Sequence, residues 1–242
     1  MRIRNWLAGV LVAGGMLAAP QAALAWSNQG HMVTGAVAYD DLAATDPKLV
    51  AKVEAVMAAH PDKARFDRGL AGYRGEARAR RLFELMARWA DDIREGPYDH
   101  PAWHYWYRVI PSKADPIKLP PQLLAITTGQ AGEAYRLNYA TVRDAYAPAA
   151  ERAVSLCWLF HIAGDIQQPL HAGHLASGRF PMSDRGGENA FVRPAAGGPG
   201  MPLHVYWDNT VGGDGAGDAN VEAVRRRLGA AWSRPELKEL DG

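Results

Sequence analysis

The chain has 242 residues, of which 48% are hydrophobic, and its 27 Lys and Arg nearly balance its 26 Asp and Glu. This balance excludes a strongly basic protein with an electrostatic stripe for duplex nucleic acid. The single cysteine, Cys157, excludes an intramolecular disulfide, so stability must come from an apolar core or from bound metal. The length suits one well-buried domain.

Residues 1–25 have the pattern of a secretory signal peptide. Two arginines in the first four residues precede an apolar stretch over 6–19, and residues 23–25 read Ala-Leu-Ala, a typical cleavage site. The apolar stretch is too short to span a bilayer, and no second long one follows. Cleavage removes two arginines and changes the formal net charge from +1 to −1. We therefore expect residues 26–242 to form an exported protein, periplasmic or secreted, without a membrane span.

The apolar periodicity of the remaining chain is mostly helical. In chain order, the expected helices run from Ser27 or Asn28 to Leu42, from Pro47 (after the cap Asp46) to about Ala59, and over residues 82–93, 133–146 and 153–167. Segments 111–121 and 173–200 are rich in Gly and Pro and read as loops, while strand signals are few and short. The expected fold class is all-α: a single multi-helix domain with long loops on one side.

The helix expected over residues 153–167 is apolar nearly all round but carries two polar side chains. His161 and Asp165 are four residues apart, so they project from the same side of the helix. An unpaired buried carboxylate is costly, so Asp165 needs a cation, either an arginine or a metal ion. Pro169 then ends the helix, and His171 follows at once.

A second pair with the same spacing, His204 and Asp208, also lies among bulky apolar residues. One such pair is compatible with an ordinary hydrogen bond, but two together indicate a metal site. An acidic residue at the end of the third helix is a further candidate; periodicity places Asp92 on the apolar stripe and does not exclude Asp91. His104, among aromatic residues, is either a core histidine or a ligand. Nitrogen and oxygen ligands without thiolates suit zinc.

Trp26 is the residue that signal cleavage would expose. A free α-amine has a reference pKa of about 7.7–8, so it can lose its proton near neutral pH. The nitrogen and carbonyl oxygen of Trp26 can then chelate a metal, and His31 follows five residues later. The alternative is that Trp26 is merely the first residue of the mature chain.

Together and in this order, these residues resemble the trinuclear-zinc phosphoesterases. This family comprises the fungal and plant single-strand-specific nucleases, their bacterial relatives and the bacterial zinc phospholipases C. The resemblance extends from Trp26 to about Asn209. Its markers are Trp26 with Gly30-His31, Trp89-Ala-Asp91, His104, His161-x3-Asp165-x5-His171 and Leu203-His204-x2-Trp207-Asp208.

The resemblance implies three zinc ions in a cleft, held by nine residues. Asp91, His104, His161 and Asp165 would hold one ion, the amine and carbonyl of Trp26 with His31 and Asp165 its close neighbour, and His171, His204 and Asp208 the third. The choice of Asp91 over Asp92 comes from the resemblance alone. His60, His100 and His174 remain, and a surface or supporting position is expected for each.

The resemblance also implies roles in catalysis and binding. Asp91 and Asp165 would act in catalysis as ligands, and Arg94 would clamp phosphate oxygens as a planar fork. Tyr105 would stack on a base and Asn209 would contact a base edge, which together select unpaired nucleotides.

The function implied is that of an exported zinc-dependent phosphodiesterase. It would cut single-stranded DNA and RNA to 5′-phosphorylated products and have 3′-nucleotidase activity, with no obligate protein partner. The alternatives are a zinc phospholipase C and a non-catalytic periplasmic zinc-binding protein.

Three features depart from the family pattern. Tyr107 stands where Asp or Asn is common, which favours the non-catalytic alternative, and Glu188 is inserted in the segment 184–189. Few residues follow Asp208, so either the chain is truncated or its helical bundle closes differently.

Overall fold

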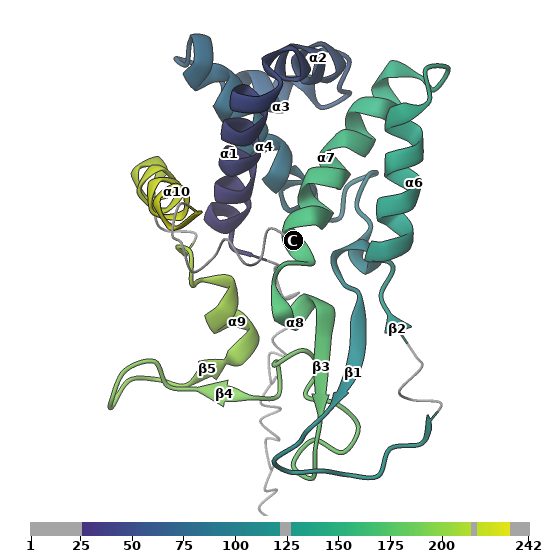
Figure 1. Cartoon of the computed structure of the whole chain (residues 1–242), viewed down its shortest axis with the longest axis vertical. Helices are drawn as coiled ribbons and strands as arrows, with labels where there is room; N and C mark the ends of the chain where they lie inside the picture. Colours follow the sequence, from purple (N-terminus) through teal and green to yellow (C-terminus); the bar gives the residue numbers. More distant parts are fainter. Residues whose placement is uncertain (1–25, 122–126, 214–216, 233–242) are drawn as a thin grey trace, which may run out of the picture.

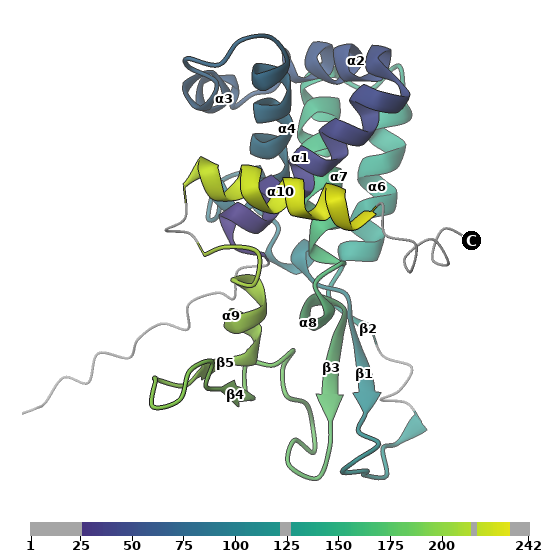
Figure 2. The ribbon, with the colours of Figure 1, turned by 60° about the vertical axis from the view of Figure 1, so that its left-hand side comes forward.

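A computed structural model describes residues 26–121, 127–213 and 217–232. The expected signal peptide lies outside the described residues. The described chain forms a helical body from which two arms extend at one end (Figures 1 and 2). We define the first arm as residues 107–121, 127–128 and 173–182, and the second arm as residues 183–209. The all-α fold class is confirmed, since the strands are few and short.

The five helices expected from the sequence are present. They are α1 (Asn28–Thr45), α2 (Pro47–Met57), α4 (Gly75–Asp92), α6 (Ala131–Arg143) and α7 (Ala149–Asp165). The side chain of Ser27 caps α1 by accepting from the amide of Gly30, and Asp46 caps α2 in the same way. The helix expected over 133–146 ends earlier, because the Asp144 side chain accepts the amide of Tyr146 and forms a turn.

Two further helices of the body, α3 (Lys63–Gly69) and α10 (Asp218–Trp232), were not predicted. The α10 helix lies against α1, where Val221 and Val224 pack on Met32 and Val33. Its other turns are rich in arginine, and Arg225 pairs with Asp40 of α1 and with Glu222. A short apolar stripe among charged residues gives little periodicity, so the sequence does not predict this helix.

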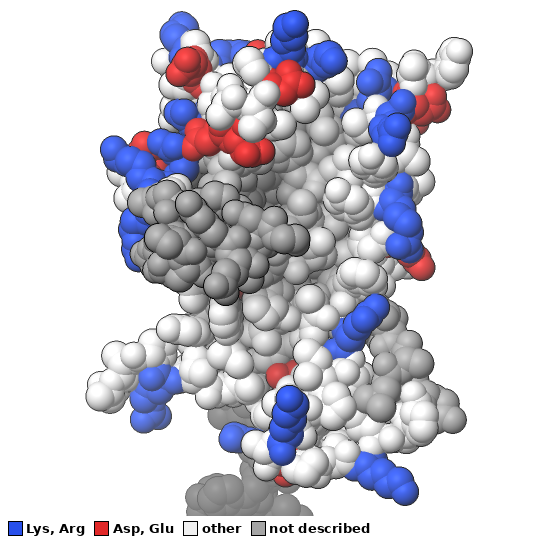
Figure 3. Space-filling view, in the orientation of Figure 1, with Lys and Arg blue, Asp and Glu red and all other residues white. Residues whose placement is uncertain are grey.

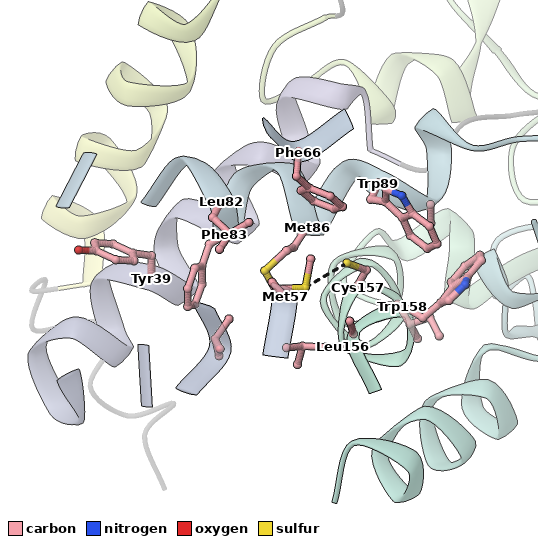
Figure 4. Packing of buried hydrophobic residues seen from close by; sticks show 14 of the residues in the cluster. Tyr39, Met57, Phe66, Leu82, Phe83, Met86, Trp89, Leu156, Cys157 and Trp158 are labelled. Carbon is pink, nitrogen blue, oxygen red and sulfur yellow. Dashed lines mark hydrogen bonds between the residues drawn. The ribbon is translucent and has the colours of Figure 1, made fainter. Parts of the chain in front are cut away.

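The core of the body lies between α1, α2, α4 and α7 (Figure 4). Phe83, Met86 and Ile162 are completely buried there, and the free thiol of Cys157 lies 3.8 Å from the sulfur of Met57. Gly35 allows α1 to approach α4 closely, because a Cβ at this position would lie 2.4 Å from a backbone carbonyl. None of the described helices is long and apolar enough to cross a membrane.

The arms are built from short strands and helices. In the first arm, β1 (Tyr107–Pro111) pairs in parallel with β3 (Gly173–Ala176) and antiparallel with β2 (Thr127–Thr128). In the second arm, β4 (Phe191–Val192) pairs with β5 (Met201–Pro202), which leads into α9 (Leu203–Asp208). The segment 173–200, expected to be entirely loop, thus contains two short strands. The short helices η1 (Pro101–His104) and α8 (Pro169–Ala172) lie where the first arm joins the body (Figure 1).

Candidate metal centre

Eight of the predicted side-chain ligands come together at the junction of the body and the arms. They are His31 of α1, Asp91 of α4, His104 of η1, His161 and Asp165 of α7, His171 of α8, and His204 and Asp208 of α9. All five histidines and Asp165 are completely buried, and the two other aspartates are nearly so. Elements far apart in the sequence therefore converge on one buried polar region.

The first group of side chains surrounds Asp165. One of its oxygens, Oδ1, lies 3.3 Å from Nε2 of His31, and the other, Oδ2, lies 3.1 Å from both Nδ1 of His104 and Nε2 of His161. Asp91 completes the group, with Oδ2 3.3 Å from Nε2 of His31. The Asp165 carboxylate thus faces different histidines with its two oxygens, as a bridging ligand does.

The second group consists of His171, His204 and Asp208. The Nε2 atoms of the two histidines are 3.1 Å apart, and Oδ2 of Asp208 lies 3.6 Å from Nε2 of His204. Two Zn–N bonds of about 2.0–2.1 Å in a tetrahedral site place their nitrogens about 3.3 Å apart. The spacing of the two ring nitrogens therefore suits a shared zinc ion.

Backbone carbonyls fix the orientation of three of these rings. Nδ1 of His161 donates to the carbonyl of Ala87 at 2.8 Å, and Nδ1 of His171 to that of His104 at 2.8 Å. Nδ1 of His204 donates to the carbonyl of Gly186 at 2.7 Å. Each bond places a ring proton on Nδ1, so Nε2, which points into its group, is the ring atom available to a metal once it carries no proton. Metal-binding histidines are held in this way.

The donor set fits a cation. His31, Asp91, His104 and Asp165 each have a buried nitrogen or oxygen without a hydrogen-bond partner among the described residues. Burial lowers the pKa of His31 to about 3 and that of His171 to about 4, so both rings are neutral at neutral pH and can donate a lone pair. Burial also raises the pKa of Asp208 to about 9, so a charged carboxylate there needs a cation beside it.

Gln168 is a supporting residue that the sequence analysis missed. It is completely buried; its amide nitrogen donates to Oδ1 of Asp208 at 2.8 Å, and its amide oxygen accepts from the backbone of Leu170 at 2.6 Å. Gln168 thereby holds the Asp208 carboxylate while Oδ2 faces His204. No periodicity or charge pattern distinguishes it from the preceding Gln167.

The structure separates the two aspartates that periodicity did not resolve. The Asp91 side chain, only 2% exposed, points into the first group, whereas Asp92 forms an ion pair with Arg88 at 2.6 Å. The apolar stripe of α4 faces the core of the body, but the metal group lies beside the last turn of this helix. Alignment with the stripe therefore does not identify the aspartate that faces the histidines.

Trp26 lies beside the first group. Its indole nitrogen donates to the carbonyl of Gly164, the residue before Asp165, at 2.9 Å. Gly30 leaves room for it, because a Cβ there would lie 2.7 Å from Cβ of Trp26. The first residue expected in the mature chain is thus anchored next to His31 and Asp165.

The predicted substrate-binding residues lie next to candidate ligands. Nη2 of Arg94 donates to Oδ1 of Asp91 at 2.5 Å. The ring of Tyr105 stacks on His171, with centroids 4.7 Å apart. Asn209 is exposed, and its amide nitrogen donates to the carbonyl of Val205 in its own helix at 2.7 Å.

Tyr107 and the remaining histidines have packing roles. Tyr107 stacks between Tyr105 and His174, and Gly186, at a positive φ of 65°, leaves room for its ring. His100 is exposed and stacks on a tryptophan. The expectation that His60 takes a surface or supporting position is wrong. His60 is buried in the core against Phe66 and Trp89.

A helical body with two groups of converging, buried His and Asp side chains defines a candidate multinuclear metal centre. The sequence family described as S1/P1 Nuclease matches residues 26–239. The chain therefore belongs to the S1/P1 nuclease family and is a hydrolase that acts on nucleic acids. No curated protein matches its sequence.

Proposed function

We propose that this nuclease is a zinc-dependent phosphodiesterase that cuts single-stranded DNA and RNA to 5′-phosphorylated products, with 3′-nucleotidase activity. The observation that carries the proposal is the convergence of eight buried His and Asp side chains in two groups. Neutral imidazoles and carboxylates without thiolates are a ligand set that zinc binds well.

We assign the ligands of three zinc ions as follows. Asp91, His104, His161 and Asp165 hold one ion, the amine and carbonyl of Trp26 with His31 and Asp165 hold a second, and His171, His204 and Asp208 hold the third. The two oxygens of Asp165, which face different histidines, support its bridging role. Zinc bound there supplies positive charge for a phosphate and lowers the pKa of a water nucleophile toward about 7.

Arg94 and Tyr105 position the substrate in this proposal. The Arg94 guanidinium is held by Asp91, beside the first group, where its planar fork can bind two phosphate oxygens. In this proposal Tyr105, whose ring stacks on both His171 and Tyr107, contacts an unpaired base through the exposed part of its ring, and Asn209 provides an amide for a base edge. A duplex hides both its base faces and its base edges, so these contacts favour single strands.

The decisive experiment offers zinc-loaded mature protein single-stranded DNA and a phosphatidylcholine emulsion in parallel. We expect cleavage of the DNA with phosphate on the 5′ ends, slower cleavage of duplex DNA of the same sequence, and no lipid hydrolysis. Hydrolysis of the lipid alone would instead identify a phospholipase C. Turnover of neither substrate would favour the non-catalytic zinc-binding protein, for which Tyr107 is the main argument.

Export is also part of the proposal, because the first 25 residues have the pattern of a signal peptide. Protein recovered from the periplasm or medium of an expressing bacterium should begin at Trp26 when its N-terminus is sequenced. A chain that keeps these residues and stays inside the cell would contradict export.

A further inference from the structure

The two arms carry six exposed basic side chains, although the whole chain is nearly neutral. They are Arg108, Lys113, Lys118 and Arg179 in the first arm, and Arg185 and Arg193 in the second. None of the six forms an ion pair within the described parts of the chain. On the face shown in Figure 3, little acidic surface is visible among the basic side chains of the lower half, whereas large areas of both kinds mix in the upper half.

Acidic side chains of the arms are mostly engaged elsewhere. Asp184 is buried and accepts the backbone amide of Leu175, and Asp208 belongs to the candidate metal centre. Asp115 is exposed but accepts the backbone amide of Arg179 at 2.9 Å. Only Glu188 and Asp115 therefore offset the positive charge at the surface of the arms.

Aromatic side chains lie beside two of these basic residues. The guanidinium of Arg108 lies 5.5 Å from the ring centroid of Trp106, and that of Arg179 lies 5.4 Å from that of Phe180. Phe191 is 66% exposed on β4. Positive charge combined with aromatic platforms is the composition of surfaces that bind single-stranded nucleic acid.

Each arm begins or ends at a candidate metal ligand. The β1 strand follows His104, β3 follows His171, and the second arm ends at His204 and Asp208. The five residues of β1 extend about 17 Å at roughly 3.3 Å per residue, so the basic residues beyond it lie well away from a phosphate at the centre.

We propose that the two arms form an extended surface that binds the phosphates on either side of the scissile bond of a single-stranded polynucleotide. The metal centre takes one phosphate, and the arms hold the flanking chain by charge and stacking. This chain should therefore prefer long single strands to dinucleotides. The inference rests on the proposed function and adds the length of substrate that the protein recognises.

The test compares two triple variants that lose the same charge. Arg179→Gln, Arg185→Gln and Arg193→Gln together remove three cations from the arms. Lys48→Gln, Lys52→Gln and Arg68→Gln remove three exposed cations from α2 and α3, at the far end of the body, and none of these forms an ion pair with another described residue. All six substitutions are at exposed positions, and circular dichroism would check that both variants fold.

Binding is measured by fluorescence anisotropy of a labelled phosphorothioate thymidine 20-mer with zinc-loaded protein. The arm variant should bind about 10-fold more weakly at low salt, and its slope of log affinity against log salt should be smaller by ~2, at about 0.7 for each lost phosphate contact. The control variant should stay within about twofold of the unaltered protein. In steady-state assays, the preference for the unmodified 20-mer over the dinucleotide d(TpT), as the ratio of KM values, should fall about 10-fold in the arm variant alone.

Equal losses in both variants would show an effect of net charge and overturn the inference, as would no loss in either. Vesicles containing phosphatidylserine test whether the arms instead bind an anionic lipid surface. If the arm variant loses vesicle binding but keeps oligonucleotide binding, the surface is for lipid and the inference is wrong. A last outcome is that the unaltered protein cleaves neither the 20-mer nor d(TpT), while the arm variant still binds the 20-mer more weakly than the unaltered protein does. In that case the proposed function is wrong and the inferred binding surface is supported.

Discussion

The helical body and the two arms are stabilised in different ways. The body encloses completely buried residues such as Phe83 and Ile162, and several basic residues on α3, α4 and α10 are paired with acidic partners, as Arg80 is with Asp40. The arms consist of short strands, and large apolar side chains such as Met182 and Phe191 are exposed on them.

The roots of the arms are instead held by hydrogen bonds around the candidate metal centre. The backbone amide of Trp106 donates to the carbonyl of His171, and the amide of Ser27 donates to that of Asp208. The rings of His171 and His204 bond to carbonyls on neighbouring segments. The body therefore has an apolar core to stabilise its fold, whereas we expect the order of the arms to depend on the polar junction.

Metal removal should separate the two regions most strongly. With a chelator, activity should be lost, and hydrogen exchange of amides in β1, β3 and α9 should accelerate by about 100-fold or more, because uncompensated carboxylates repel one another at the roots of the arms. Amides in α2 and α6, which carry no candidate ligand, should change little. Equal acceleration in both regions would show that the body also requires the metal.

Asp165→Asn acts at the junction itself. An amide cannot supply negative charge to two ions, so activity should fall on the order of 1,000-fold or more, which corresponds to about 4 kcal/mol. Zinc content, measured by elemental analysis, should fall from about three per chain. Asp92→Asn is the control. Asp92 pairs with Arg88, so its substitution should have only a mild effect on zinc content and activity. Greater damage from the control would refute the choice of Asp91 over Asp92.

An extra residue before Trp26 tests the N-terminal amine as a ligand. A peptide nitrogen lacks the lone pair of an amine, so the extended protein should bind less zinc and lose about 100-fold in activity, although every side chain is unchanged. Replacing the Trp26 side chain while keeping a free terminus should be milder. Full zinc content and activity in the extended protein would remove the amine from the ligand set.

Phe83→Ala and Phe191→Ala compare the two regions by packing alone. Phe83 is completely buried in the body, so its truncation should cost about 3–5 kcal/mol in the free energy of unfolding. Phe191 is 66% exposed on an arm, and its truncation should change this free energy by about 0.5 kcal/mol or less. Urea denaturation of the zinc-loaded proteins measures both; similar losses would contradict the division of the molecule.

The free energy of unfolding should depend on pH because of His60, which is buried in the body. Burial lowers the pKa of His60 from 6.5 to about 4, although nearby Asp62 opposes the shift. The unfolded chain therefore binds a proton that the native state does not. The stability that neutral, buried His60 contributes is complete above pH 6.5. It is lost as the pH falls from 6.5 to 4, which lowers the free energy of unfolding by about 3 kcal/mol at most. Urea denaturation of His60→Gln should show a weaker decline over this range; an identical pH profile would refute this role.

The parts of the fold predicted from the sequence are those governed by local rules. The helix caps Ser27 and Asp46 and the stripe of α4 depend on residues within a few turns of one another. The pairing of β1 with β3 was not predicted, because it joins Arg108 to Gly173 across the chain and no local pattern specifies a partner. His60 was placed wrongly for the same reason: its aromatic neighbour Trp89 comes from another helix.

The residue types of the candidate centre and the spacing of the two His/Asp pairs can be read from the sequence, since a helical turn places residues four apart on one side. Periodicity did not choose between Asp91 and Asp92; the resemblance favoured Asp91, and the tertiary structure places Asp91 among the histidines and Gln168 behind Asp208. It also gathered unpaired cations on the arms of a nearly neutral chain. These features depend on which distant segments meet, and packing of the whole body, rather than any local preference, decides that.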